Sequence, residues 1–190
     1  MLLLVGLGNP GSNYTNTRHN IGFKIIDAIN SHFKLSKQKP KFKGLLTTGN
    51  IESKKIYAIK PLTFMNNSGT AIKELIDYFK IDAKDVFVFH DDMDIDFGKI
   101  KAKFGGGSAG HNGIESLDKF IGKDYSRVRV GIGHPKQKKK VNNHVLEDFK
   151  EDEEEKIKEI TDNIVKLIPT LIDKKIDLFS SKVNQNLNGI

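Results

Sequence analysis

The sequence predicts an α/β protein that forms one domain over residues 1–190, with a mixed, twisted β-sheet and helices on both of its faces. Three observations predict this class. Apolar runs of strand length alternate along the chain with segments of helical periodicity, which is the pattern of layered α/β folds. The length of 190 residues suits one domain. No internal repeat, low-complexity stretch or linker divides the sequence.

Strands are expected where a short apolar or alternating run is bounded by turn-forming residues. They are expected at residues 2–8, 44–51, 55–60, 86–90, 98–104 and 127–133. The first and fourth of these runs are apolar enough to be buried strands. The second and third are separated only by a short turn and are expected to form a hairpin, and residues 98–104 alternate as a strand at a sheet edge should.

Helices are expected at residues 21–33, 68–80 and 112–122, the first of these because its apolar side chains recur near helical spacing. A further helix is expected to begin with the acidic run at Glu151, because the helix dipole favours negative charge at an N-terminus. Pro169 is expected to kink or interrupt this tail helix. The chain therefore alternates strands and helices before ending in helix.

The charge is unevenly distributed. The formal net charge is +7, with residues 1–150 carrying +10 and residues 151–190 carrying −3. A basic body fits a polyanionic ligand such as nucleic acid, which binds with release of counterions. A lysine-rich, solvated surface would give the same total, so charge alone leaves both interpretations open.

The composition excludes several classes of protein. The chain has no cysteine, which excludes disulfides, thiolate catalysis and zinc–thiolate sites. No apolar run approaches the ~20 residues of a membrane span, so no membrane association is expected. The start "MLLLVGLGNPG" has no basic n-region and is expected to be a strand rather than a secretory signal. A cytoplasmic location is expected.

A complete G-x-G-x-x-G stands at Gly6, Gly8 and Gly11, which raises the possibility of a dinucleotide site. Such a site needs a helix that starts at the glycines, so that backbone N–H groups meet the pyrophosphate. Pro10 removes one N–H inside the motif, and nine polar, turn-prone residues precede the helix expected at 21–33. The context therefore argues against a dinucleotide site.

The loop that follows the first strand instead presents polar side chains where open α/β sheets bind ligands. His19 is the candidate base in this loop, since an imidazole exchanges protons near neutral pH. The strand at 86–90 ends in "HDDMD", and one of these carboxylates is expected to accept the other N–H of His19. A calcium loop is rejected, because Gly98 comes too late and Lys103 stands where a glutamate is needed. A solvated histidine and an ordinary acidic turn remain alternatives.

Two more loops carry candidate binding residues. "KPLTFMNNSG" places Phe64, Met65 and Asn66 just before a helix, where an aromatic ring can stack on a base and an amide can bind a carbonyl oxygen or cap the helix. "KAKFGGGSAGHNG" is a glycine-rich flap whose backbone can approach a ligand closely. His111 and Asn112 at its end favour a functional loop over a simple connector.

Four segments together resemble one family. "VGLGNPGSNYTNTRHNIG", "KPLTFMNNSG", "FHDDMDIDFGKIKAKFGGGSAGHNG" and "RVRVGIGHP" are similar to segments of the bacterial peptidyl-tRNA hydrolases and come in the same order. The similarity covers essentially the whole chain. It implies a monomeric α/β enzyme, without cofactor, that cleaves the ester joining an N-blocked peptide to the 3′ ribose of tRNA. No metal is expected.

The resemblance also implies roles for individual residues. His19 is similar to the catalytic base, Asp91 to the residue that stabilises its basic form, and Asn9 to the residue that distinguishes blocked from free aminoacyl-tRNA. The positions similar to tRNA- and substrate-binding residues are Tyr14, Phe64, Asn66 and Asn112, with Met65 in the cleft wall and Lys103 and Arg129 at the tRNA 5′ phosphate. The acidic turn at residues 94–97 and the interior of the flap depart from the family pattern without removing a matched residue.

The expected mechanism is direct attack by water, with His19 removing the proton and Asp91 orienting the ring. Asn66 and Asn112 are candidates to hold the peptide, the water or the oxyanion, and their individual roles stay open. Two alternatives are kept. One is a non-catalytic RNA-binding protein that stacks bases on aromatic side chains. The other, disfavoured by Pro10, is a nucleotide-dependent oxidoreductase.

Overall fold

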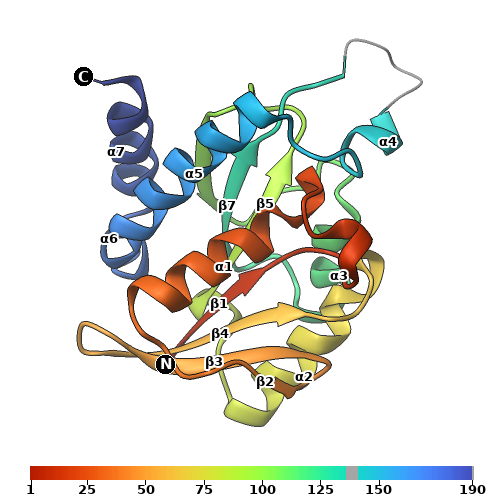
Figure 1. Cartoon of the computed structure of the whole chain (residues 1–190). Helices are drawn as coiled ribbons and strands as arrows, with labels where there is room; N and C mark the ends of the chain where they lie inside the picture. Colours follow the sequence, from red (N-terminus) through yellow and green to blue (C-terminus); the bar gives the residue numbers. More distant parts are fainter. Residues whose placement is uncertain (136–140, 190) are drawn as a thin grey trace.

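The computed structural model describes residues 1–135 and 141–189, and its strands form one sheet (Figure 1). They are β1 (Leu2–Gly6), β2 (Lys39–Lys41), β3 (Gly44–Ile51), β4 (Lys54–Pro61), β5 (Val86–Asp92), β6 (Ile100–Phe104) and β7 (Ser126–Gly131). The order across the sheet is β2-β3-β4-β1-β5-β7-β6. β1 is parallel to β4 and β5, and β5 to β7, whereas β2 and β3, β3 and β4, and β6 and β7 pair antiparallel. The sheet is mixed, as the sequence predicts.

Helices cover both faces of this sheet. They are α1 (Ile21–His32), α2 (Ser68–Phe79), α3 (Asn112–Ile121), α4 (Val141–His144), α5 (Glu151–Lys166), α6 (Ile168–Ile172) and α7 (Ile176–Asn188). α1, α5 and α7 share one apolar core with one face, and α2 and α3 share a second core with the other. Figure 1 shows α1 and α5 in front of the sheet and α2 and α3 behind it. The expected α/β class is confirmed.

The glycines of the N-terminal motif serve close packing. A Cβ on Gly6 would collide with the backbone of Gly22 in α1, and a Cβ on Gly8 would lie 2.7 Å from the ring of Phe23. α1 begins only at Ile21, so its N-terminus does not follow the glycines directly. The motif therefore brings β1 and α1 together, in agreement with the rejection of a dinucleotide site.

Several element boundaries differ from expectation. β5 continues through Asp92, so that Asp91 lies within the sheet rather than in the turn after it. The tail divides into α5, α6 and α7, and Pro169 stands in the first turn of α6, which confirms the expected interruption. β2 and α4 were not expected. No helix in the described ranges combines the length and apolar character needed to cross a bilayer.

The outer edge of β6 is covered by α7 rather than left open. The side-chain Oδ1 of Asn184 accepts a hydrogen bond from the backbone N–H of Ile100 at 3.0 Å, and its Nδ2 donates to the carbonyl oxygen of the same residue at 2.7 Å. The hydroxyl of Ser180 accepts from the N–H of Ala102 at 3.3 Å. β6 is therefore an edge strand, as expected, and backbone groups on its outer side bond to side chains of α7.

Candidate active site

A cavity of about 320 Å³ lies where the parallel strands β1, β4 and β5 end. Open α/β sheets bind ligands at this edge because the carboxyl ends of their strands meet there. The cavity walls come from segments that are far apart in the sequence: Asn9 and His19, residues 64–66, 91–94 and 108–112, and residues 145–146. The sheet thus brings together the loops that the sequence analysis identified as candidates. Residues 145–146 form a further part of the wall that the sequence analysis did not predict.

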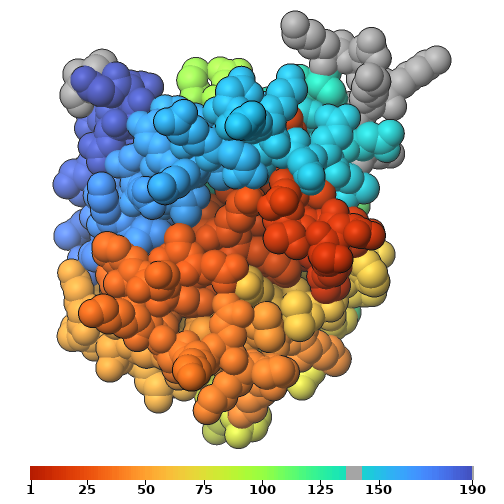
Figure 2. All heavy atoms as spheres, viewed as in Figure 1, coloured from red at the N-terminus to blue at the C-terminus, as the bar shows by residue number. Residues whose placement is uncertain are grey.

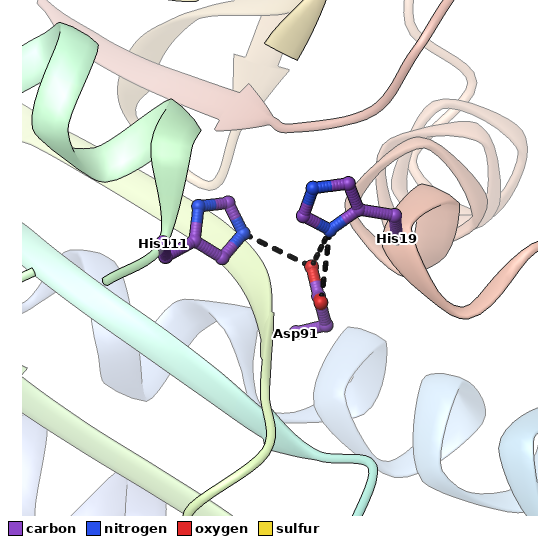
Figure 3. A group of neighbouring side chains, drawn as sticks. All are labelled: His19, Asp91 and His111. Carbon is purple, nitrogen blue, oxygen red and sulfur yellow. Dashed lines mark hydrogen bonds and ion pairs between the residues drawn. The ribbon is translucent and has the colours of Figure 1, made fainter. Parts of the chain in front are cut away.

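His19 and Asp91 both line this cavity, and their side chains point toward each other (Figure 3). His19 lies in the short 3-10 turn η2 (Arg18–Asn20) that leads into α1, and Asp91 is in β5. The Nδ1–H of His19 donates to both carboxylate oxygens of Asp91, at 2.8 and 2.9 Å. This assigns the proton of a neutral His19 to Nδ1 and leaves Nε2 as a lone-pair acceptor. In Figure 3, Nε2 points away from Asp91.

His111 is the third member of the cluster; the sequence pointed to it as a sign of a functional loop but did not predict its contact with Asp91. Its Nδ1 accepts from the backbone N–H groups of Gly113 and Ile114 at 3.1 and 3.3 Å, so it is the N-cap of α3. Its Nε2–H therefore donates to Oδ1 of Asp91, at 3.0 Å. The signal in the sequence was its place directly before a predicted helix, where a capping side chain stands.

The hydrogen bonds explain the electrostatics of Asp91. Burial of this side chain raises the pKa of Asp91, but the imidazoles of His19 and His111 and their hydrogen bonds outweigh burial and hold it well below its usual range. Asp91 is therefore a carboxylate throughout the physiological range. A fixed negative charge beside Nδ1 stabilises the imidazolium that forms when Nε2 takes a proton.

The same three side chains have the spacing of a metal site. One nitrogen or oxygen atom from each of His19, Asp91 and His111 lies within 4.8 Å of the others. In the observed arrangement, both oxygens of Asp91 accept hydrogen bonds from ring N–H groups. Hydrogen bonding thus accounts for the cluster, and the expectation that no metal is bound stays a prediction.

Asn9 is held in the cavity wall by its neighbours. Its Oδ1 accepts from the N–H of Met65 at 2.8 Å. Its backbone N–H donates to Oδ1 of Asn20 at 2.9 Å, and Nδ2 of Asn20 donates to its carbonyl oxygen at 3.0 Å. Because Oδ1 of Asn9 is occupied, its side-chain NH₂ group is the part of this amide that remains for a ligand.

The remaining candidates divide between the cavity and its surroundings. Phe64, Met65, Asn66 and Asn112 line the cavity. Tyr14 is outside the lining but packs edge to face against Phe64, with ring centroids 6.4 Å apart and an interplanar angle of 84°. Phe64 is 58% exposed, so this aromatic pair is available at the mouth of the cavity.

Lys103 and Arg129 lie beside the cavity rather than in it. They are on the neighbouring strands β6 and β7, and Nε of Arg129 donates to Oδ2 of Asp92 at 2.7 Å. Asp92 itself lines the cavity. Lys103 pairs in register with Arg127, two residues along β7 from Arg129, and burial together with the charges of Arg129 and Arg127 lowers the pKa of Lys103. The two strands therefore form a basic flank next to the carboxylate end of β5.

Comparison with known proteins places this geometry in one family. Residues 3–189 match the family model described as peptidyl-tRNA hydrolase. A peptidyl-tRNA hydrolase of Pelagibacter ubique is 72% identical over 184 residues, covering 97% of this chain and 99% of that protein. One of Ehrlichia canis is 46% identical, covering 97% and 95% of the two chains. The crystal structure of peptidyl-tRNA hydrolase from Acinetobacter baumannii superposes with a TM-score of 0.90 at 34% identity, covering 97% and 94%. The resemblance expected from the sequence is confirmed: the chain belongs to the peptidyl-tRNA hydrolase family.

Proposed function

We propose that this chain hydrolyses the ester bond between an N-blocked peptide and the 3′ ribose of tRNA by direct attack of water. Membership of the peptidyl-tRNA hydrolase family supports the substrate and the reaction. The observation that carries the mechanism is the bond from His19 Nδ1 to Asp91 in the lining of the cavity, which leaves Nε2 free as an acceptor. This arrangement suits a base that removes a proton from water.

In the proposed reaction, Nε2 of His19 takes the proton of a water molecule as the oxygen attacks the ester carbonyl carbon. Asp91 holds the ring in the required tautomer and compensates the charge of the imidazolium. Base catalysis of this kind contributes about 10²–10⁴-fold to the rate. The proton then passes to the leaving ribose oxygen, so the imidazole returns to its neutral form.

A covalent route through a serine has less support. Residues 106–110 read G-x-S-x-G, but Oγ of Ser108 donates to Glu115 at 3.2 Å and accepts from the N–H of Gly110. The carboxylate of Glu115 is a weaker base than an imidazole, and no imidazole bonds to the Ser108 hydroxyl among the described residues, so this serine lacks the usual activating partner. Water activated by His19 is therefore the favoured nucleophile.

The other candidates are proposed to bind the substrate. The free NH₂ group of Asn9 suits the carbonyl of a blocked amino group, which would distinguish blocked from free aminoacyl-tRNA. Amides of Asn66 and Asn112 are proposed to hold the peptide or the oxyanion. The aromatic rings at the mouth, with Met65 in the wall, are proposed to contact the 3′ end of the tRNA, where a base can stack on Phe64 or Tyr14.

The decisive experiment compares wild type with His19→Ala in hydrolysis of N-acetylated aminoacyl-tRNA. We expect kcat to fall by about 10²–10⁴-fold while tRNA affinity persists, because the base is removed without touching the binding surface. His32→Ala is the matched control, since this histidine is exposed at the far end of α1. Near-wild-type turnover by His19→Ala would rule out the base. If the wild-type protein binds tRNA but does not hydrolyse the ester, it would instead be a non-catalytic RNA-binding protein.

Lys103 and Arg129 are proposed to engage the 5′ phosphate of the tRNA. Replacing either by alanine is expected to raise KM and to lower the slope of binding against log salt by about one, because one phosphate contact releases about one counterion. Lys84→Ala is the control, since Lys84 is exposed in the 3-10 turn η4 (Ala83–Asp85), before the opposite end of β5. A change in kcat alone, with binding and its salt slope intact, would contradict the phosphate contact.

We also propose that the chain acts as a monomer and in the cytoplasm. The bonded pair His19 and Asp91, which carries the proposed chemistry, is supplied within a single chain. Peptidyl-tRNA arises in translation, which places the substrate in the cytoplasm. The proposed steps likewise use only side chains of this protein and call for no cofactor.

A further inference from the structure

Arg18, the residue directly before His19, is buried although it carries a charge. Its side chain is 4% exposed, and its Nη2 pairs with Oε2 of Glu153 at 2.8 Å. The guanidinium lies over the ring of Phe149, with 5.0 Å between its Cζ and the ring centroid. Nε and Nη1 are also buried, and neither finds an acceptor among the described residues.

This arrangement is costly for a residue that only fills space. A buried N–H group without an acceptor loses its hydrogen bonds to water, and a buried charge loses more. A well-packed apolar side chain of similar size often replaces a buried ion pair without loss of stability. The burial of Arg18 therefore points to a task that an apolar residue would not perform.

The backbone around Arg18 is tied to a distant segment. The N–H of Arg18 donates to the carbonyl oxygen of Glu147 at 3.0 Å, and the N–H of His19 donates to that of Val145 at 2.8 Å. Thr17 and Asp148 form an antiparallel β-bridge. Residues 145–149 thus run along residues 16–19, and Figure 2 shows the red N-terminal segment and the cyan segment in contact at the surface.

Glu153 anchors the other end of the ion pair. Its Oε2 also accepts from the backbone N–H of Lys150 at 2.8 Å, which fixes this side chain in the capping box at the N-terminus of α5. α5 packs against α1 in the apolar core. Arg18 therefore joins the turn that carries His19 to a helix end whose position is set by the core.

We propose that Arg18 is a positioning residue for His19, and that its pair with Glu153 holds the turn η2 so that the His19 ring meets Asp91 with Nε2 directed into the cavity. The proposal rests on the function proposed above. Catalytic geometry tolerates little error, because a displacement of about 1 Å can lower a rate by about 10²-fold. Two anchors, one on the ring and one on the preceding side chain, fix the orientation more tightly than either alone.

The test is a matched pair of variants at the N-terminus of α5. Glu153→Gln keeps an oxygen that can accept from Lys150 but removes the charge that binds Arg18. Glu154→Gln removes the same charge from the same turn of helix, where Glu154 pairs with Lys24 of α1 at 3.2 Å. We expect Glu153→Gln to lower kcat by about tenfold with KM unchanged. Glu154→Gln should stay within about twofold of wild type, because it alters the same dipole but not Arg18.

The pH profile separates positioning from a general structural role. The groups that face His19 are Asp91, through Nδ1, and His111, whose ring centroid is 4.8 Å from that of His19. If the ring moves away from Asp91, the imidazolium loses stabilisation. The acidic limb of the kcat/KM profile should then move to lower pH in Glu153→Gln and stay in place in Glu154→Gln.

A double-variant cycle completes the test. Arg18→Gln and Glu153→Gln should have the same effect on kcat, and the double variant should be no worse than either, because the two residues act as one unit. Should Arg18→Gln not fold, Glu153→Gln decides alone. Wild-type kcat and an unmoved acidic limb in Glu153→Gln would overturn the proposal, as would an equal loss in Glu154→Gln. An inactive wild type would instead contradict the proposed function.

Discussion

Three imidazole rings crowd the end of β5, with 4.8 Å between the ring centroids of His19 and His111 and between those of His90 and His111. Their hydrogen bonds give them different roles. His19 has one nitrogen on Asp91 and one free, whereas both nitrogens of His111 are bonded. Nδ1 of His90 bonds to the carbonyl oxygen of Asp91 at 2.7 Å, and its Nε2 is buried without a partner among the described residues. Of the three, only His19 has the contacts that suit a base.

The burial of His90 predicts a pH-dependent stability. Burial, and next the neighbouring His111, hold the pKa of His90 well below its ordinary value, so this ring is neutral in the folded protein. In the unfolded chain His90 takes up a proton near pH ~6.5, whereas in the folded chain it does not. The contribution of His90 to the free energy of unfolding is therefore complete above that pH and is lost as the pH falls. Between about pH 7.5 and about pH 5, His90→Gln should therefore lose less stability than wild type in urea unfolding.

The control for this prediction is His32→Gln, because His32 is exposed and its removal should leave the pH slope unchanged. Glutamine at position 90 keeps an N–H that can donate to the Asp91 carbonyl oxygen. If the free energy of unfolding falls as much in His90→Gln as in wild type over this pH range, another group causes the acid sensitivity.

Among the elements, α7 has a role that its amphipathic pattern alone does not reveal. Its apolar residues Phe179 and Val183 enter the core, while Asn184 and Ser180 bond to the edge of β6. A side-chain amide carries both an acceptor oxygen and N–H donors, so Asn184 can satisfy both backbone groups of Ile100. The helix therefore closes an edge that would otherwise be open for pairing with another chain.

Asn184→Ala tests this role of α7. The variant leaves the N–H of Ile100 without its partner, and we expect the free energy of unfolding to fall by about 1–3 kcal/mol. Gln185→Ala, at an exposed neighbouring position of the same helix, should change it by less than about 0.5 kcal/mol. Urea titration of both variants measures the difference. Equal effects would show that helix propensity, not the edge contact, determines the result.

For the whole molecule, the sequence predicted those features that depend on local patterns. The alternation of apolar runs gave the mixed sheet with helices on both faces, and Pro169 marked the break in the tail. β2 was missed because Lys39–Lys41 carries no apolar pattern, and among the described strands it pairs with β3 alone. Periodicity reports that a residue is buried and does not report which partner buries it.

The site shows the same division. Motif resemblance named His19 and Asp91, and the fold brings these two side chains into contact. The bond from His111 to Asp91 and the burial of Arg18 depend on contacts between segments distant in sequence, which local patterns do not report. Residues 145–146, which complete the cavity wall, were missed for the same reason.

The covering of β6 by α7 has a consequence during synthesis. α7 follows every described strand, so all seven strands can leave the ribosome while Ile100 and Ala102 still lack their helix partners. Translation adds about 5–20 residues per second, so the outer edge of β6 stays without its helix partners for a few seconds before Asn184 emerges. Nascent chains on neighbouring ribosomes of one messenger RNA can then pair with each other through the exposed edge of β6. Arrest of translation before Asn184 would prolong this exposure and favour aggregation.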